Sequence, residues 1–384
     1  MDFLKEIKNF DVDGSKNLRL KGKMRNYTTF RIPIEMLKYN KKNDRIASFM
    51  SEYAENHDID TIDEDTIEGF IFESSERNKR TLKNIKAIGQ IEPAVVMSDG
   101  VVVDGNRRFT CLRKLYRETK DDKYKYIVAA ILDKDIYKDK DIKKLELQIQ
   151  NVEEKVKYNP IDRYVGIYRN IIREPQEFSI EEYASDSNKK VSEIREEVLL
   201  TTLMIKYLEF INKPLKFHYA RKNDLDGTIN EMKSMERSTT ITKEDKHITE
   251  ELCFSGFASG VDSKKIRELL DATKNKDVFD EQRKNEAKEL NNQVYNSCHE
   301  EGFIDESLKE KSNDFVIELI EDNGLSKEKN KDENQLEKAL NNIKKIDKEV
   351  VVNMNEEHRT SFDKKLASIR NELDALERLD HAKE

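Results

Sequence analysis

The residues best suited to chemistry follow a glycine in the segment 88–118, which reads IGQIEPAVVMSDGVVVDGNRRFTCLRKLYRE. Gly105 precedes Asn106, Arg107 and Arg108, and apolar residues then recur at helical spacing. The first backbone N–H groups of a helix are free and its dipole is positive there, so anions are favoured. Guanidinium groups add directional donors that match phosphate oxygens. These residues therefore predict a phosphate-binding corner.

Because a glycine followed by two arginines is common in charged sequences, this prediction depends on the elements that hold the three residues. Val95 and Val96 are β-branched strand formers, and a second valine run follows at 101–103. Asp99-Gly100 lies between the runs and Asp104-Gly105 closes the second one, which is a strong hairpin signal. The pattern predicts strand, turn, strand, turn and helix. In that context a phosphate site is a better interpretation than two solvated arginines.

The order of four motifs resembles the N-terminal domain of the ParB/sulfiredoxin superfamily over residues 28–210. The motifs, as they stand here, are YNKKNDR at 39–45, TLKNIKAIGQIEPAVV at 81–96, VVVDGNRRFTCLRKL at 101–115, and LQIQNVEEKVKYNPIDRYVGIYRNI at 147–171. The resemblance implies an α+β fold, with a small mixed sheet in the N-terminal domain followed by all-α regions that include a helix-turn-helix.

The resemblance also implies a nucleotide site, in which a Gly-x-Arg-Arg box binds the triphosphate of CTP or another nucleoside triphosphate. Gly105, Arg107 and Arg108 match the box, with Asn106 where the family usually has glutamate. A downstream Glu-Asn pair helps to hold the nucleotide and Mg²⁺. The further residues that match the family by position are Asn40, Asn43, Arg45, Gln150, Asn151 and Lys155.

Gln150 stands where the family has the carboxylate, and an amide is a weaker Mg²⁺ ligand. This departure puts hydrolysis in doubt more than binding, so a weak CTPase activity stays open. Glu153 and Glu154, about one turn further on, are candidate replacements, although solvation at the surface is the simpler role for both.

The cysteines argue against redox and zinc chemistry. The chain has three, Cys111, Cys253 and Cys298, without metal-ligand spacing or an even number for pairing. Sulfiredoxin-type reduction needs a reactive cysteine beside the phosphate-binding arginine. Cys111 instead falls on the apolar face of the predicted helix, so we expect a buried core thiol.

A helix-turn-helix is predicted downstream of Asn159-Pro160. Ser179 and Glu182 form a capping box, the turn falls at 186–188, and a second helix follows from Val191. The candidate DNA-contacting residues are Asn188, Lys189, Lys190, Ser192 and Arg195. Three glutamates at 193, 196 and 197 oppose phosphate contacts, which predicts weak or partner-assisted DNA binding. A packing unit of three helices without a DNA role is the alternative.

The organisation of the chain follows from proline and apolar spacing. All five prolines precede residue 215, which indicates a change from mixed structure to helices between Lys213 and Gly227. We expect an N-terminal extension at 1–27, a nucleotide-binding domain at 28–150, a helix-turn-helix-like domain at 151–226 and a charged helical region at 227–384. Two heptad-like stripes end the chain, one at 336–350 and one at 362–376, with a bend at VVVNMN between them. They fit either an intramolecular hairpin or a homodimeric coiled coil.

Composition excludes several classes of protein. Of 384 residues, 39% are charged and 36% hydrophobic, and the net charge of −8 rules out a uniformly basic nucleic-acid coat. No stretch is apolar enough for a membrane span, and the N-terminus lacks a signal-peptide pattern, so we expect a cytoplasmic protein without a membrane partner. The leading interpretation is a nucleotide-binding, DNA-associated protein. The alternatives are a metal-dependent nuclease or kinase using Asp104 with Glu153 or Glu154, and a non-catalytic scaffold of a mobile element or defence locus.

Overall fold

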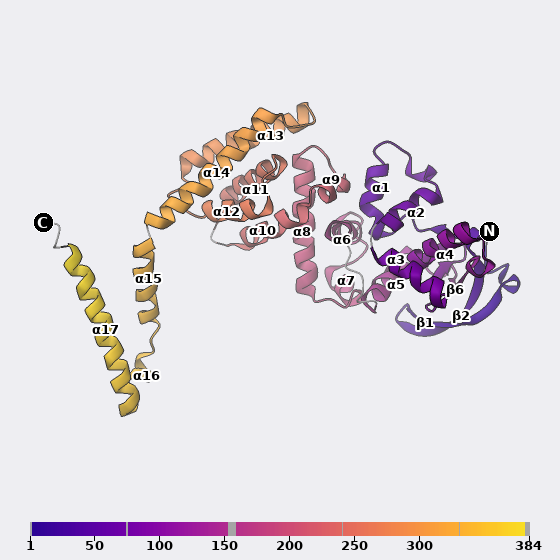
Figure 1. Cartoon of the computed structure of the whole chain (residues 1–384), viewed down its shortest axis with the longest axis horizontal. Coiled ribbons are helices and arrows are strands. Elements are labelled where there is room, and N and C mark those ends of the chain that lie inside the picture. The colour runs from indigo at the N-terminus through magenta and orange to yellow at the C-terminus, as the bar shows by residue number, and fades with distance from the viewer. Residues whose placement is uncertain (1, 74–75, 153–158, 240, 330, 381–384) are drawn as a thin grey trace. The chain divides into compact units, whose positions relative to one another are not determined.

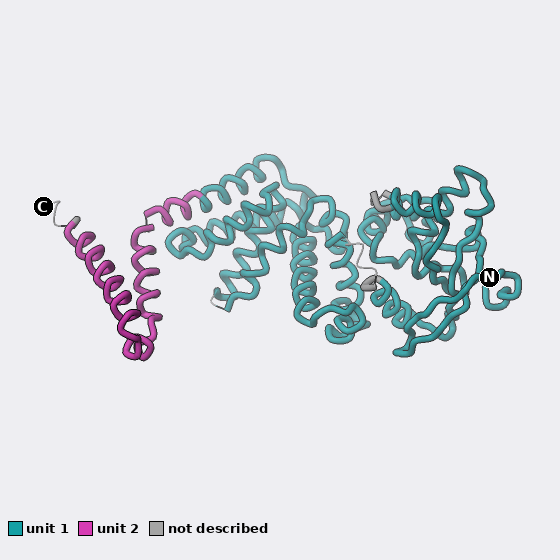
Figure 2. Tube along the Cα trace, turned by 60° about the horizontal axis from the view of Figure 1, so that its bottom comes forward, with its two compact units in different colours: residues 1–320 teal, residues 321–384 magenta. Residues whose placement is uncertain are grey.

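The computed structural model describes residues 2–73, 76–152, 159–239, 241–329 and 331–380 (Figure 1). The chain divides into two compact units, residues 1–320 and residues 321–384 (Figure 2). The first unit contains a mixed sheet followed by helices, and the second is helical. The fold is therefore α+β, as the sequence predicts. None of the described helices combines the length and the apolar character that crossing a membrane requires.

Six strands form one mixed sheet in the order β1-β2-β6-β4-β5-β3. The strands are β1 (Asp11–Leu20), β2 (Lys23–Pro33), β3 (Lys38–Tyr39), β4 (Ala94–Met97), β5 (Val101–Asp104) and β6 (Tyr126–Leu132). The β4–β5 pair is antiparallel and turns at Gly100, which confirms the predicted hairpin. The neighbouring pairs β4–β6 and β3–β5 are parallel, which makes the sheet mixed.

Strand β1 and the first part of β2 lie in the expected N-terminal extension at 1–27, and they belong to the same sheet as the later strands. These strands carry few apolar residues, since most of their side chains are exposed and only Leu18 and Leu20 of residues 11–27 are buried. An exposed strand lacks the apolar alternation that identifies a half-buried strand in a sequence. Phe3 is also fully buried and belongs to the core of this domain.

Helices cover one face of the sheet, and the other face packs against the β1–β2 hairpin and one helix. Phe109, Leu112 and Leu115 of α4 contact the first face, together with residues of α2 and α3. Leu18, Leu20 and Leu145 of α5 contact the second. The helices are α1 (Ala47–Tyr53), α2 (Glu64–Glu73), α3 (Glu76–Ile88), α4 (Asn106–Thr119) and α5 (Asp139–Val152), with short 3₁₀ segments η1 (Ile7–Asn9), η2 (Ile34–Met36), η3 (Asp44–Ile46), η4 (Ile59–Thr61) and η5 (Asp122–Tyr124).

The rest of the first unit is helical and surrounds a core of its own (Figure 1). Its elements are α6 (Pro160–Ile167), the π-helix η6 (Tyr168–Ile172), α7 (Ile180–Asp186), α8 (Val191–Phe210), α9 (Phe217–Lys222), α10 (Leu225–Arg237), α11 (Lys243–Ala258), α12 (Ser263–Ala272), α13 (Glu281–Glu300) and α14 (Glu306–Lys329). The last strand of the described residues ends at Leu132, so the expected change at Lys213–Gly227 is wrong. Prolines mislead here because Pro160 occupies the first turn of a helix, where its missing N–H costs nothing.

The pair α7–α8 has the predicted helix-turn-helix elements. Ser179 caps α7 and Glu182 completes the capping box, as predicted. A turn follows, in which Asn188 has φ of 47°, and α8 then begins at Val191. Helix α8 is twenty residues long and its second half lies in the core of the helical region. The second helix of the pair therefore also forms part of the core of the helical region.

The second unit contains the end of α14 and three further helices, α15 (Lys331–Lys344), α16 (Lys348–Val352) and α17 (Glu356–Asp380). Helices α15 and α17 lie as two arms joined through α16 (Figure 2), and the chain bends after Val352, as predicted. Apolar residues of both stripes are about half exposed, among them Leu336, Leu340, Leu373 and Leu376. The predicted helices are confirmed, whereas the homodimeric coiled coil stays a prediction.

Candidate functional site

The turn between β5 and α4 requires glycine. Gly105 has φ of 99°, a conformation that side chains disfavour. A Cβ atom added there would lie 2.8 Å from Cβ of Ala94 in the neighbouring strand. Because Gly105 is also the N-cap of α4, no side chain caps the helix from that position. The first N–H groups of α4 are therefore suited to an external anion.

Two connected hollows open at this turn. A small cavity of about 60 Å³ lies between η3, the β5–α4 turn and α5. A groove of about 650 Å³ continues from it along β1, α3 and α5. Both are lined by Arg45, Asp104, Gly105, Asn106, Arg107 and Ile149. The groove falls within the range of about 300–1,000 Å³ that small-molecule ligands occupy.

The structure brings most of the predicted nucleotide residues together. Asn43, Arg45, Gly105, Asn106 and Arg107 all line the small cavity, although 60 residues separate Arg45 from Gly105 in the sequence. Asn43 holds the first of these segments by accepting a hydrogen bond from the Arg45 N–H at 3.0 Å.

Other predicted residues contribute less or cannot be placed. Asn40 does not line either hollow but donates a hydrogen bond to Glu146 at 3.0 Å. The side chains of Gln150 and Asn151, at the end of α5, are not described, and Lys155 lies outside the described residues, as do Glu153 and Glu154.

Arg108 differs from the expectation. It lines the groove, but its Nη2 atom donates to Asp104 Oδ2 at 3.0 Å, and both side chains are less than one-fifth exposed. Lys16 from β1 approaches the same carboxylate at 3.7 Å and bonds Glu92 at 2.7 Å, which lowers the pKa of Glu92. Arg108 thus serves partly to balance an acid. Arg45 and Arg107 line both hollows, whereas Arg108 lines the groove alone.

A buried ion network lies directly behind the small cavity, and sequence reasoning missed it. The Lys143 ammonium contacts both Asp44 and Glu146, the latter at 3.5 Å, and all three side chains are about one-tenth exposed. Burial opposes the charge of Lys143, but the two carboxylates outweigh it and raise the pKa of its ammonium group. Burial raises the pKa of Glu146, against the effect of Lys143.

Glu146 is the carboxylate that lines the small cavity from α5. It lies four residues before Gln150 and therefore on the same side of the helix. The spacing of four residues is visible in the sequence, and it points one turn before Gln150, whereas the expected replacements Glu153 and Glu154 follow it. Glu146 thus places a carboxylate in the wall of the small cavity, one turn before Gln150.

The groove has an apolar wall beyond its charged end. Ile88 and Ile91 are 66% and 75% exposed beside it. The loop that carries Ile91 is fixed by Gln90, whose side-chain amide exchanges two hydrogen bonds of 2.8 Å with the Val128 backbone. A ligand with a charged and an apolar end fits these surroundings.

Cys111 is a core residue, as predicted. It is fully buried, its nearest hydrogen-bonding partner is the Asn78 carbonyl at 3.8 Å, and burial raises the pKa of its thiol to about 11. A thiol of this kind is a poor nucleophile at neutral pH. Cys253 and Cys298 are buried free thiols as well.

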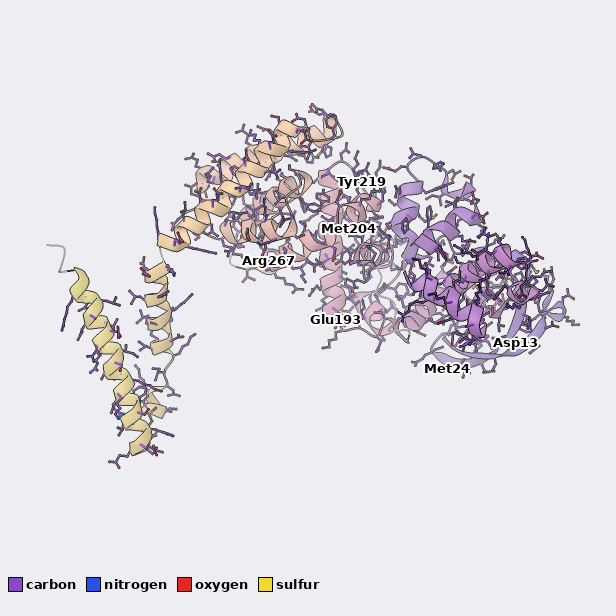
Figure 3. All side chains as sticks on the ribbon, viewed as in Figure 1. Asp13, Met24, Glu193, Met204, Tyr219 and Arg267 are labelled. Atoms are coloured by element: carbon purple, nitrogen blue, oxygen red, sulfur yellow. The ribbon has the colours of Figure 1, made fainter. Side chains whose placement is uncertain are left out.

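The predicted DNA-contacting residues lie on the α7–α8 pair, where acids hold several of them. Lys189 pairs with the buried Glu197 at 2.7 Å, and Arg195 lies 3.4 Å from Glu181. Lys190 and Ser192 are exposed at the start of α8, but so is Glu193 (Figure 3). Asn188 forms the turn. The ion pairs reduce the positive charge that α8 presents to a phosphate backbone.

Among the described residues, no group of three or more His, Cys, Asp or Glu side chains is arranged to hold a metal ion. A comparison of the sequence with models of protein families gives no match. A search of curated proteins likewise finds none that is similar. The functional interpretation therefore depends on the geometry of the groove and on the motifs that line it.

Proposed function

We propose that the protein binds a nucleoside triphosphate, with CTP as the first candidate, through the groove at the start of α4. The observation that carries the proposal is the convergence of Arg45 and Arg107 on the glycine turn at Gly105. Two guanidinium groups, uncapped helix N–H groups and a groove large enough for a nucleotide make one site. The apolar wall at Ile88 and Ile91 suits the nucleoside end. The motif order that resembles ParB proteins supports CTP.

Mg²⁺ fits this site in its usual form, held by one or two protein oxygens together with phosphates. The carboxylate of Glu146 lines the small cavity, and so does Asn106, whose Oδ1 atom is buried and accepts no hydrogen bond from a described residue. These two side chains would hold the ion. When bound, Mg²⁺ would neutralise phosphate charge, while Arg45 and Arg107 orient the phosphates. Asp104 is a weaker candidate for a catalytic metal, because it already pairs with Arg108 and Lys16.

DNA association through α7–α8 is the second part of the proposal. The capped first helix, the turn and the exposed start of α8 support it, and Lys190 with Ser192 are the residues best placed for contacts. The ion pairs of Lys189 and Arg195 favour weak binding by this element alone. Nucleotide and DNA together point to a cytoplasmic protein.

Calorimetric titration of CTP, ATP and GTP with Mg²⁺ tests the nucleotide role. We expect binding of at least one nucleotide by the natural sequence and a loss of about tenfold or more on Arg107→Ala, since a charge-assisted hydrogen bond contributes roughly 1.5–3 kcal/mol. Lys86→Ala is the matched control, because Lys86 is an exposed cation of α3 that does not line the groove. Absence of heat with all three nucleotides would reject the proposal.

A further inference from the structure

The β1–β2 hairpin carries an unusual concentration of positive charge. Between Lys16 and Asn26 the sequence KNLRLKGKMRN contains five lysines and arginines and no acid, in a chain with a net charge of −8. The five are Lys16, Arg19, Lys21, Lys23 and Arg25. Local charge of this kind on an acidic protein indicates an anionic partner at that surface.

The hairpin presents these residues on a two-stranded ribbon that extends beyond the part of β2 paired with β6. Strand β2 pairs with β6 only from Thr29 to Pro33, whereas its pairing with β1 continues outward to Leu20 and Lys23. A two-residue turn closes the ribbon, and both of its residues, Lys21 and Gly22, have positive φ. This is the tight turn that matches the twist of a two-stranded ribbon.

One side of the ribbon is anchored and the rest is open. Leu18 and Leu20 pack into the protein, and Lys21 donates to the Ile136 carbonyl at 2.9 Å. Arg19 and Lys23 are exposed and form no ion pair with any residue that the structure describes. Met24 and Asp13 mark the ribbon in Figure 3. The ribbon is thus held in place while two of its cations remain available to a partner.

We propose that this ribbon is a contact surface for double-stranded DNA, with Arg19 and Lys23 on phosphates. The major groove of B-form DNA admits a two-stranded β-ribbon as well as it admits a helix. The major groove of A-form RNA is too narrow and deep for side chains to read, which disfavours duplex RNA. The ribbon also carries the asparagine pair Asn17 and Asn26, joined by a hydrogen bond of 2.8 Å, and such amides are able to reach base edges.

This surface goes beyond the proposed function, which places DNA on α7–α8. In the α7–α8 pair, Lys189 and Arg195 face glutamates, whereas residues 16–26 of the ribbon include no acid. Arg19 and Met24 also line the nucleotide groove, so the ribbon forms one of its walls. Arg19 therefore belongs both to the wall of the groove and to the proposed DNA surface, whereas Lys23, which pairs with Leu20 across the ribbon, does not line the groove.

Fluorescence anisotropy with a labelled duplex of mixed sequence, about 20 base pairs long, tests the inference over about 50–300 mM salt. We expect Arg19→Gln/Lys23→Gln to weaken binding by about 60-fold at 0.1 M salt. The slope of log affinity against log salt should fall by about 1.8, at 0.9 for each phosphate contact. The matched control, Lys190→Gln/Arg195→Gln, removes two exposed cations from α7–α8 and should change the affinity less.

Several outcomes would overturn the inference. They are absence of duplex binding by the natural sequence, equal binding by the ribbon variant, a larger loss in the α7–α8 variant, and an equal or stronger ribbon-dependent affinity for duplex RNA or anionic vesicles. Both variants alter exposed side chains, and their thermal unfolding should match that of the natural sequence. CTP calorimetry on the natural sequence and on Lys23→Gln alone separates this inference from the nucleotide proposal, because Lys23 does not line the groove, whereas Arg19 does.

Discussion

Replacement of Gly105 by alanine tests the construction of the site in the most local way. The new Cβ would lie 2.8 Å from Ala94 Cβ and 3.3 Å from Ala94 Cα, so the clash falls on the strand itself. The residue would also have to keep φ at 99°. Gly89 provides a control, since its φ is 77° but no atom lies within 4 Å of an added Cβ.

The two substitutions differ by one physical effect. Left-handed backbone costs a residue with a side chain about 1–2 kcal/mol, which applies to both Gly105→Ala and Gly89→Ala. Overpacking against the strand adds about 1–3 kcal/mol at Gly105 alone. We therefore expect a loss of about 2–5 kcal/mol in unfolding free energy for Gly105→Ala and about 1–2 kcal/mol for Gly89→Ala. Urea unfolding followed by circular dichroism measures both.

A second substitution isolates the contact. In the Ala94→Gly background the Cβ–Cβ clash is absent, so Gly105→Ala should cost about 1 kcal/mol less than in the natural sequence. If Gly105→Ala were no more destabilising than Gly89→Ala, or if the Ala94 background made no difference, the close approach of the turn to β4 would be refuted.

Three other predictions concern buried ionisable groups. Lys143→Met should lower the unfolding free energy by about 3–5 kcal/mol, because it leaves Glu146 as a buried carboxylate without its cation and Asp44 with Arg169 alone; a loss below 1 kcal/mol in urea unfolding would contradict the network. Burial, opposed by Glu55, lowers the pKa of His218 below its usual 6.5. The unfolded chain therefore takes up this proton first as the pH falls through about 6.5, and stability should decrease there, with a flatter pH profile in His218→Gln. Thiol titration with an aromatic disulfide at pH 8 should find Cys111 and the two other buried cysteines unreactive until urea is added; fast labelling of the folded protein would show that a thiol is accessible.

The parts of the site that the sequence predicts are those fixed by neighbouring residues. The valine runs, the Asp-Gly turns and the capping box at Ser179 are local signals, and each produced the expected element. Gly105 and Arg107 followed from them. The convergence of Asn43 and Arg45 on the same cavity came from the order of motifs, since no local pattern joins segments so far apart.

What was missed depends on long-range pairing or on a signal that was not used. The ribbon has little apolar alternation, because most of its side chains are exposed, so its strands are recognised only through their partners. The Asp104–Arg108 ion pair was visible as an i,i+4 spacing and should have warned that Arg108 is not free for a ligand. The approach of Lys16 to Glu92, across 76 residues, had no such signal.

Proline positions explain why the sequence predicts the change from mixed structure to helices too late in the chain. Pro160 begins a helix and Pro214 lies in the turn between α8 and α9, so both prolines belong to the helical part of the chain. Gly166 of α6 is a position where close packing requires glycine. A Cβ there would lie 2.8 Å from Asp44 Oδ2, so the glycine lets α6 pass close to the ion network behind the cavity.

A crystal structure of the protein with a non-hydrolysable CTP analogue and Mg²⁺ tests the central claim most directly. We predict phosphate oxygens within hydrogen-bonding distance of the first N–H groups of α4 and of the Arg107 guanidinium, with the nucleoside along the groove towards Ile88. Nucleotide bound elsewhere, or a groove closed by its own side chains at saturating ligand, would contradict the account.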